Sequence, residues 1–124
     1  MSENEKQFTF DEYSKIASST AIYPNEISVE SHHKIIGILY CALKLSGESG
    51  EVAEQIGKSI RDDHGKISDD RLWKLKKELG DVLWYVNELS QLLGFTLEEI
   101  AIHNNMKLAA RKMNGTISGS GSDR

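Results

Sequence analysis

Apolar residues recur at helical spacing over about eight turns in one stretch of the chain. The stretch begins near Ser31 and ends at Asp62, just before His64 and Gly65. A helix of this length with an apolar stripe has to pack against other helices, so it predicts a helical bundle. The residues of the stripe are Ile35, Ile38, Leu39, Ala42, Leu45, Val52, Ile56 and Ile60.

Three further segments have helical patterns. A capping-box pattern at 9–12 predicts a short helix that ends near Ser19. A third helix is expected from Ser68 to Gly94, and a second capping box at 96–99 opens a last helix that runs through Arg111. Strand signals are nearly absent. We therefore expect an all-α antiparallel bundle of about four helices in a single domain, 1–124, with a flexible Gly/Ser-rich tail at about 115–124.

The size and charge of the chain limit its possible partners. A domain of 124 residues with four helices has few layers to cover one another, so we expect oligomerisation to complete the bundle. The net charge of -4 gives no basic footprint for duplex nucleic acid. No apolar run approaches the roughly 20 residues of a membrane span. The single cysteine, Cys41, lies in an apolar run and is expected to be a buried thiol in a reducing compartment, so we expect a cytoplasmic protein.

Four carboxylates fall where the bundle should be apolar. Glu48 and Glu51 form an E-x-x-E pair on one face of the long helix, and Glu78 and Asp81 form an E-x-x-D pair on the next helix. Glu48 and Glu78 both lie on stripes of apolar residues, where a charge is costly unless it is paired or bound to a cation. If the two helices pack antiparallel, the four acids converge, and hard carboxylate oxygens favour Mg²⁺, with Mn²⁺ as a substitute.

The alternative interpretation is that these acids are solvated surface charges, as most helical acids are. For one pair alone that interpretation is preferable, but two pairs on apolar stripes, flanked by Gly47, Gly50 and Gly80, favour a metal site. The glycines would permit close helix approach or make room for a ligand. The aromatic residues Trp73, Trp84 and Tyr85 are candidates to stack on a base, with core packing as the simpler role.

Basic residues on the last helix supply candidate phosphate contacts. Lys107 and Arg111 stand four residues apart on one face, where an anion between them would relieve their repulsion. The alternative is a basic helix end that complements the macrodipole. No phosphate-binding glycine loop and no nucleophile motif is present, so metal and water would have to perform the chemistry.

Three segments together resemble the MazG-like nucleotide pyrophosphohydrolases of the small stand-alone or phage-associated type. They are Leu45 to Glu54, Glu78 to Tyr85, and the N-x-x-K-L-x-x-R element from Asn104 to Arg111. The resemblance extends from about Leu39 to Arg124. It implies an all-α dimer or dimer of dimers that converts nucleoside triphosphates to monophosphate and pyrophosphate, with a preference for deoxynucleotides.

The resemblance also implies roles for individual residues. Glu48, Glu51, Glu78 and Asp81 become magnesium ligands at the catalytic centre, and water activated by the metal attacks the α-phosphorus. Asn104, Lys107 and Arg111 become nucleotide contacts. Many members carry a tyrosine and a proline after the arginine, and both are absent here. Two other functions stay open: a helical interaction module without activity, and a phosphatase that uses the same metal site.

Overall fold

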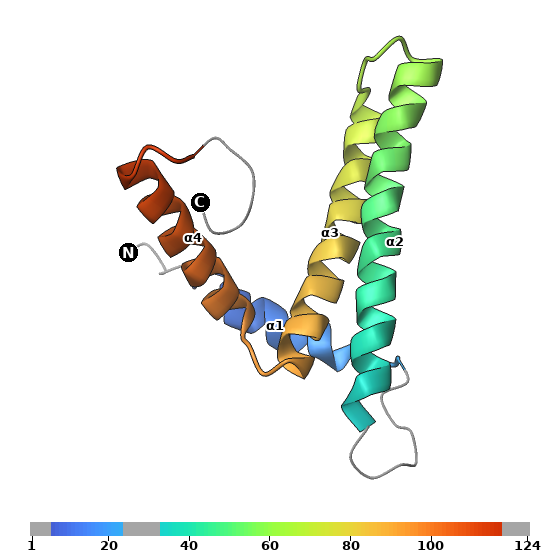
Figure 1. Ribbon diagram of the computed structural model, residues 1–124. Coiled ribbons are helices and arrows are strands. Elements are labelled where there is room, and N and C mark those ends of the chain that lie inside the picture. The colour runs from blue at the N-terminus through green and yellow to red at the C-terminus, as the bar shows by residue number, and fades with distance from the viewer. Residues whose placement is uncertain (1–5, 24–32, 118–124) are drawn as a thin grey trace, which may run out of the picture.

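The computed structural model describes residues 6–23 and 33–117, and every regular element in this part of the chain is a helix. In chain order these are α1 (Phe10–Ser19), α2 (His33–Asp62), α3 (Asp69–Leu92) and α4 (Leu97–Met113) (Figure 1). The predicted all-α class is confirmed, and the helix ends agree with the predicted ones to within a few residues. The expected helix start near Ser31 and residues 118–124 of the expected tail lie outside the described residues.

Local hydrogen bonds explain where three of the helices begin. The side chains of Thr9 and Thr96 each accept a hydrogen bond from the backbone N–H three residues further on. In return, the carboxylates of Glu12 and Glu99 accept from the backbone N–H groups of these threonines. Both predicted capping boxes are therefore confirmed. Ser68 caps α3 through its side-chain oxygen.

Glycines end α3 and α4. Gly94 and Gly115 have φ angles of 86° and 67°, in the left-handed region where only glycine fits without strain. After Gly115, the N–H of Thr116 reaches back to the carbonyl of Arg111 at 2.9 Å, which is the bond of a Schellman cap. Gly115 and Thr116, at the start of the Gly/Ser-rich segment, are thus part of the end of α4.

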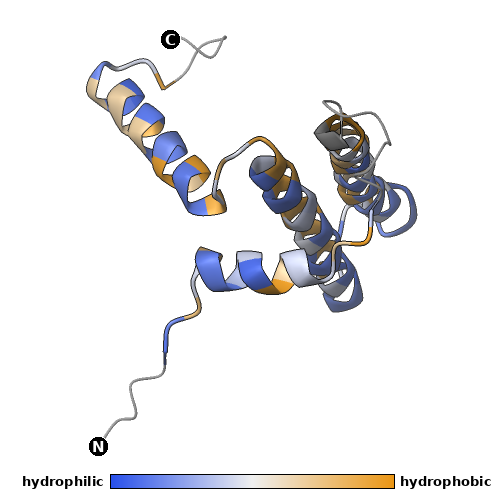
Figure 2. Cartoon of the chain, turned by 90° about the horizontal axis from the view of Figure 1, so that it is seen from below, coloured by the Kyte–Doolittle hydropathy of each residue, from blue (hydrophilic) through white to orange (hydrophobic). Residues whose placement is uncertain are grey.

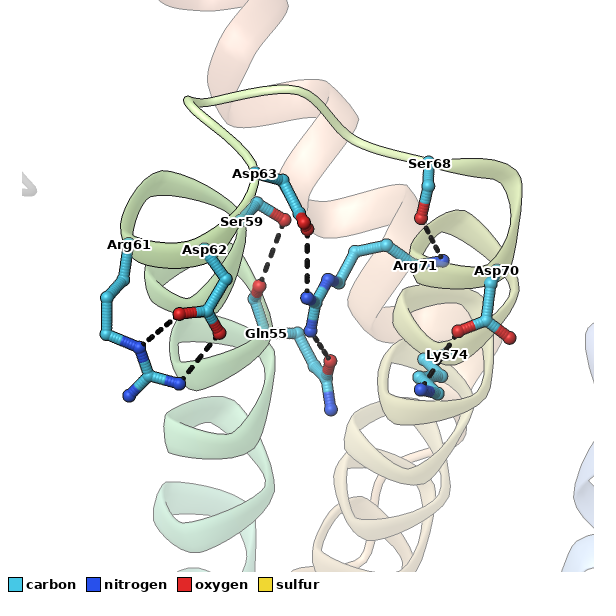
Figure 3. Close-up of polar contacts among 9 residues, drawn as sticks. All are labelled: Gln55, Ser59, Arg61, Asp62, Asp63, Ser68, Asp70, Arg71 and Lys74. Carbon is cyan, nitrogen blue, oxygen red and sulfur yellow. Dashed lines mark hydrogen bonds and ion pairs between the residues drawn. The ribbon is translucent and has the colours of Figure 1, made fainter.

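Helices α2 and α3 form a long antiparallel hairpin whose closed end is fixed by polar side chains (Figure 3). The guanidinium of Arg71 donates to Oε1 of Gln55 at 2.9 Å and to Oδ2 of Asp63 at 3.1 Å. The Arg71 side chain is only 15% exposed. The neighbouring pair of Arg61 and Asp62, in contrast, joins adjacent residues at the surface. Arg71 is therefore the side chain that holds the two helices in alignment at this end.

This alignment determines which residues face each other further along the hairpin. Glu48 lies seven residues before Gln55 on α2, and Glu78 lies seven residues after Arg71 on α3. Seven residues span about 10.5 Å on either helix and make close to two full turns. The contact between Gln55 and Arg71 therefore places Glu48 and Glu78 at one level, on the sides where α2 and α3 meet.

Helix α1 attaches to α3 near the other end of the hairpin through buried polar groups. The hydroxyl of Ser14 donates to Oδ1 of Asn87, and the hydroxyl of Ser18 donates to Oε2 of Glu88 at 3.0 Å. Asn87 and Glu88 are both buried, and the amide of Asn87 donates to the Glu88 carboxylate. Because the buried side chains of Asn87 and Glu88 have hydrogen-bond partners, polar residues can hold α1 at a position where apolar residues would normally pack.

Helix α4 diverges from the hairpin (Figure 1). Among the described residues it contacts α1 and α3 but not α2. Figure 2 shows the same separation from below, with hydrophobic residues along α4 that the hairpin does not cover. A single chain therefore supplies an open arrangement of four helices, with α2 and α3 as its closely packed pair.

Few apolar side chains are buried in the described part of one chain. The buried ones are Ala17, Cys41, Leu75 and Leu97, so the expectation of a buried thiol is confirmed. No described helix combines the length and the apolar character needed to cross a membrane. Several positions of the predicted stripe on α2 are exposed, because no second helix layer covers them. Exposed large apolar residues include Ile35, Leu39, Ile56, Ile60, Leu72, Leu79, Ile102, Met106, Leu108 and Met113.

Candidate metal centre

Three of the four predicted acids meet between α2 and α3. One carboxylate oxygen each from Glu48, Glu78 and Asp81 lies within 4.8 Å of the other two. Glu48 and Glu78 are partly buried, whereas Asp81 is exposed. The antiparallel hairpin thus joins an acid from one sequence motif to two acids from the other. Carboxylate oxygens this close together repel one another unless a proton or a cation lies among them.

The fourth predicted acid, Glu51, lies beside this group. Its side chain is exposed, and its charge and hydrogen bond act on Glu78. Burial, followed by the negative charges of Glu51, Asp81 and Glu48, raises the pKa of Glu78 above its ordinary value of 4.5. Glu78 is therefore the acid whose pKa is raised by the charges of the other three acids. Because its pKa is raised, Glu78 holds a proton more tightly than an isolated glutamate does.

The three helix glycines next to the acids leave open space. A Cβ atom built on Gly47, Gly50 or Gly80 would meet no neighbouring atom within 4 Å. Within the described chain, close approach of α2 and α3 therefore does not require these glycines. The other expected role, room for a ligand, remains a proposal.

The rings of Trp84 and Tyr85 form an aromatic wall beside the acids. A pocket of about 300 Å³ is lined by Glu48, Asp81, Trp84 and Tyr85. Trp84 and Tyr85 meet edge to face with their ring centroids 4.9 Å apart. Two of the three aromatic residues singled out in the sequence thus lie at the acids. The third, Trp73, is exposed and lies under the ammonium of Lys76 instead.

Further aromatic residues support this wall. Tyr40 tilts against Tyr85, and Tyr23 stacks on Tyr40 and meets the edge of Trp84. The indole N–H of Trp84 donates to the hydroxyl of Thr20 at 3.0 Å, so the segment after α1 fixes this ring. Burial, with the Tyr40 hydroxyl and the charge of Glu48, raises the pKa of Tyr85 to about 12. The sequence did not reveal Tyr23 and Tyr40, because their roles depend on contacts between distant segments.

Lys44 also lies at this site and was missed in the sequence. Its Nζ atom is 3.4 Å from Oε1 of Glu48 and 5.8 Å from the centre of the Tyr85 ring. The signal that would have found it is the spacing of four residues between Lys44 and Glu48, which places both on one helix face.

The predicted phosphate contacts lie on α4, which diverges from the hairpin that carries the acids (Figure 1) and does not contact α2 in the described chain. Asn104 and Lys107 line a separate pocket of about 600 Å³, together with His103 and the apolar residues Phe95 and Leu97. Arg111 lies one turn after Lys107 and is buried within its own chain, with 7% of its surface exposed. One chain therefore brings the acids together, but it does not bring Asn104, Lys107 and Arg111 to them.

The sequence matches a known protein family. Residues 38–116 match the family model described as "MazG nucleotide pyrophosphohydrolase domain". The matched range includes all four acids and Asn104, Lys107 and Arg111. The chain is also 41% identical over 114 residues to "Gene 37 protein" of Mycobacterium phage L5, an alignment that covers 92% of this chain and 97% of the phage protein. No solved structure gives a significant match.

Helix α1 lies before the matched range, while α2 from Ile38, all of α3 and all of α4 lie within it. The match covers well over half of the chain and contains both acidic motifs of the hairpin. The chain belongs to the MazG nucleotide pyrophosphohydrolase family.

Proposed function

We propose that the protein is a Mg²⁺-dependent pyrophosphohydrolase that converts nucleoside triphosphates to monophosphate and pyrophosphate. The observation that carries the proposal is the meeting of Glu48, Glu78 and Asp81 within 4.8 Å on two facing helices. Membership of the MazG family supports the reaction type. The proposed substrates are nucleoside triphosphates, with deoxynucleotides preferred.

The donor set fits magnesium. The three clustered side chains offer only carboxylate oxygens, and no cysteine or histidine belongs to the group. Oxygen ligands of this kind suit Mg²⁺ or Mn²⁺, whereas Zn²⁺ favours histidine and cysteine. Glu48, Glu78 and Asp81 would hold the ion, and Glu51 stands next to Glu78 as the fourth ligand. Bound there, Mg²⁺ would lower the pKa of a water molecule and offset charge on the phosphates.

The residues of this chain would also position the nucleotide. The pocket of about 300 Å³ joins Glu48 and Asp81 to the rings of Trp84 and Tyr85, at the lower end of the size range for small-molecule sites. A base stacked on these rings would put its phosphates beside the acids, with the α-phosphorus as the atom that water attacks. A carboxylate of the cluster would accept the proton of the attacking water.

An assembly of at least two chains completes the proposed site. One chain exposes large apolar residues on all four helices and leaves α4 apart from α2. We expect a homodimer or a homotetramer that covers these residues and brings Asn104 and Lys107 of α4 near the acids of another copy. Arg111, one turn after Lys107 on the same helix, is the third proposed nucleotide contact. Light scattering at micromolar concentration tests this point, and a stable single chain would contradict it.

The activity test uses each standard ribonucleoside and deoxyribonucleoside triphosphate separately with Mg²⁺, and anion-exchange chromatography resolves the products. The proposal predicts monophosphate and pyrophosphate, lost in Glu48→Gln, and a ranking with deoxynucleotides first. Diphosphate and orthophosphate would indicate a phosphatase at the same site. A protein with no turnover and no gain in melting temperature with Mg²⁺ would be a helical interaction module instead.

A further inference from the structure

The ammonium of Lys44 contacts both a carboxylate of the acid cluster and an aromatic ring beside it. On α2 it precedes Glu48 by four residues, and its ammonium lies 3.4 Å from the Glu48 carboxylate. The same ammonium lies 5.8 Å from the centre of the Tyr85 ring, within the range of a cation–π contact. Two of the four residues that line the pocket, Glu48 and Tyr85, therefore hold one lysine at its edge.

This ion pair differs from other pairs of the same spacing in the hairpin. The Glu48 side chain is 13% exposed, whereas the acids in the pairs of Lys58 with Glu54 and Lys74 with Asp70 are 61% and 75% exposed. The exposed pairs are ordinary surface contacts with little effect on the chain. At Glu48 the lysine instead offsets negative charge inside a group of three carboxylates. Lys44 therefore acts as a counter-ion of the cluster.

The position of Lys44 also suits a phosphate. Its ammonium lies beside the Glu48 carboxylate and over the Tyr85 ring. The phosphates of a nucleotide stacked on Trp84 and Tyr85 would pass between these two groups. Helix α4, which carries Lys107 and Arg111, does not contact α2 within the described chain. A lysine on a flexible four-carbon stem can leave a carboxylate and donate to a phosphate oxygen without moving the helix.

We propose that Lys44 is a substrate-binding residue with two alternating partners: it neutralises Glu48 when no cation is bound, and it binds a phosphate oxygen of the nucleotide when Glu48 serves the metal. This inference rests on the proposed function. Lys44 and a divalent cation then compete for the same carboxylate, because both draw on the negative charge of Glu48. Loss of the lysine should strengthen metal binding and weaken nucleotide binding, two effects of opposite sign that general damage to the fold would not produce.

The experiment compares Lys44→Gln with Lys44→Arg, which keeps the charge, and with Lys58→Gln, which removes the matched lysine of an exposed pair on the same helix. Binding of Mn²⁺ alone is measured without nucleotide from the EPR signal of free Mn²⁺. Lys44→Gln should bind Mn²⁺ about threefold more tightly than the wild type, the effect expected from losing a partly exposed ion pair. Lys58→Gln should bind it as the wild type does.

Steady-state kinetics on the nucleoside triphosphate supply the second readout. Lys44→Gln should raise KM about tenfold through loss of a charged hydrogen bond, and Lys44→Arg should restore most of the affinity. If Lys44→Gln matches Lys58→Gln in both Mn²⁺ affinity and KM, the role of Lys44 is wrong while the proposed hydrolysis stands. If the wild type neither binds Mn²⁺ nor hydrolyses any triphosphate, the proposed function fails and the role of Lys44 fails with it.

Discussion

Replacing Arg71 with alanine tests whether the hydrogen bonds of its side chain hold α2 and α3 in alignment. The guanidinium donates to Gln55 at 2.9 Å and to Asp63 at 3.1 Å, and both contacts would be lost together. A hydrogen bond that involves a charged group contributes about 1.5–3 kcal/mol. The Asp63 side chain is 39% exposed and can bind water after the change, so the lower part of the range applies. We expect Arg71→Ala to lower the free energy of unfolding by about 2 kcal/mol.

The neighbouring ion pair supplies a matched control (Figure 3). Arg61 donates to Asp62 through two hydrogen bonds of 2.7 and 2.8 Å, but the Arg61 side chain is 70% exposed and its partner is the adjacent residue. Such a pair contributes less than about 1 kcal/mol, so Arg61→Ala should leave stability nearly unchanged. Both arginines form an ion pair, but only Arg71 is largely buried and joins two helices. A difference in stability between the two variants would therefore come from burial and from the link between the helices.

Urea unfolding followed by circular dichroism measures both variants. An unchanged dependence on urea would show that only stability has changed. For a chain of this size, 2 kcal/mol corresponds to a fall in melting temperature of roughly 5–12 °C. The reasoning would be refuted if Arg71→Ala unfolded like the wild type, or if Arg61→Ala cost as much as Arg71→Ala.

Three further predictions concern other parts of the chain. Because the folded protein raises the pKa of Glu78 above 4.5, the folded state binds its proton more tightly than the unfolded state. Without metal, the wild type should therefore lose melting temperature relative to Glu78→Gln as the pH rises above 4.5, and parallel curves would contradict this. Asn87→Leu should cost about 2–3 kcal/mol in urea unfolding, since it removes the buried amide that donates to the Glu88 carboxylate and accepts from the Ser14 hydroxyl. A neutral result would mean that these polar contacts do not hold α1. Gly47→Ala and Gly57→Ala should each stabilise α2 by about 1 kcal/mol, because an added Cβ meets nothing, but only the change at Gly47, beside Glu48, should slow hydrolysis. Equal activity of the two glycine variants would remove the argument that Gly47 makes room for a ligand.

Local chemistry made the helices predictable from the sequence. Thr9 and Thr96 begin helices because each has a glutamate three residues later, and Gly94 ends one because it adopts a left-handed conformation. The convergence of the acids was also predictable, since two apolar stripes each carried a charge where burial is costly. These features depend on neighbours within one or two helical turns, which a sequence displays directly.

The arrangement of α1 and α4 was not predictable in the same way. The attachment of α1 depends on Asn87 and Glu88, two polar residues whose burial becomes evident only when Ser14 and Ser18 face them. The separation of α4 from α2 is also a tertiary property, and it leaves Lys107 away from the acids in one chain. Apolar periodicity indicated which helix faces have to pack against another helix, but it did not indicate whether that helix comes from the same chain.

Isotope labelling of the products tests the central claim most directly. The triphosphate is hydrolysed in water enriched in ¹⁸O with Mg²⁺ present, and mass spectrometry locates the label in single-turnover products. Attack of water at the α-phosphorus predicts ¹⁸O in the monophosphate and unlabelled pyrophosphate, with no product from Glu48→Gln. Label in the pyrophosphate would contradict attack at the α-phosphorus, and label in orthophosphate beside a diphosphate would contradict the pyrophosphohydrolase itself.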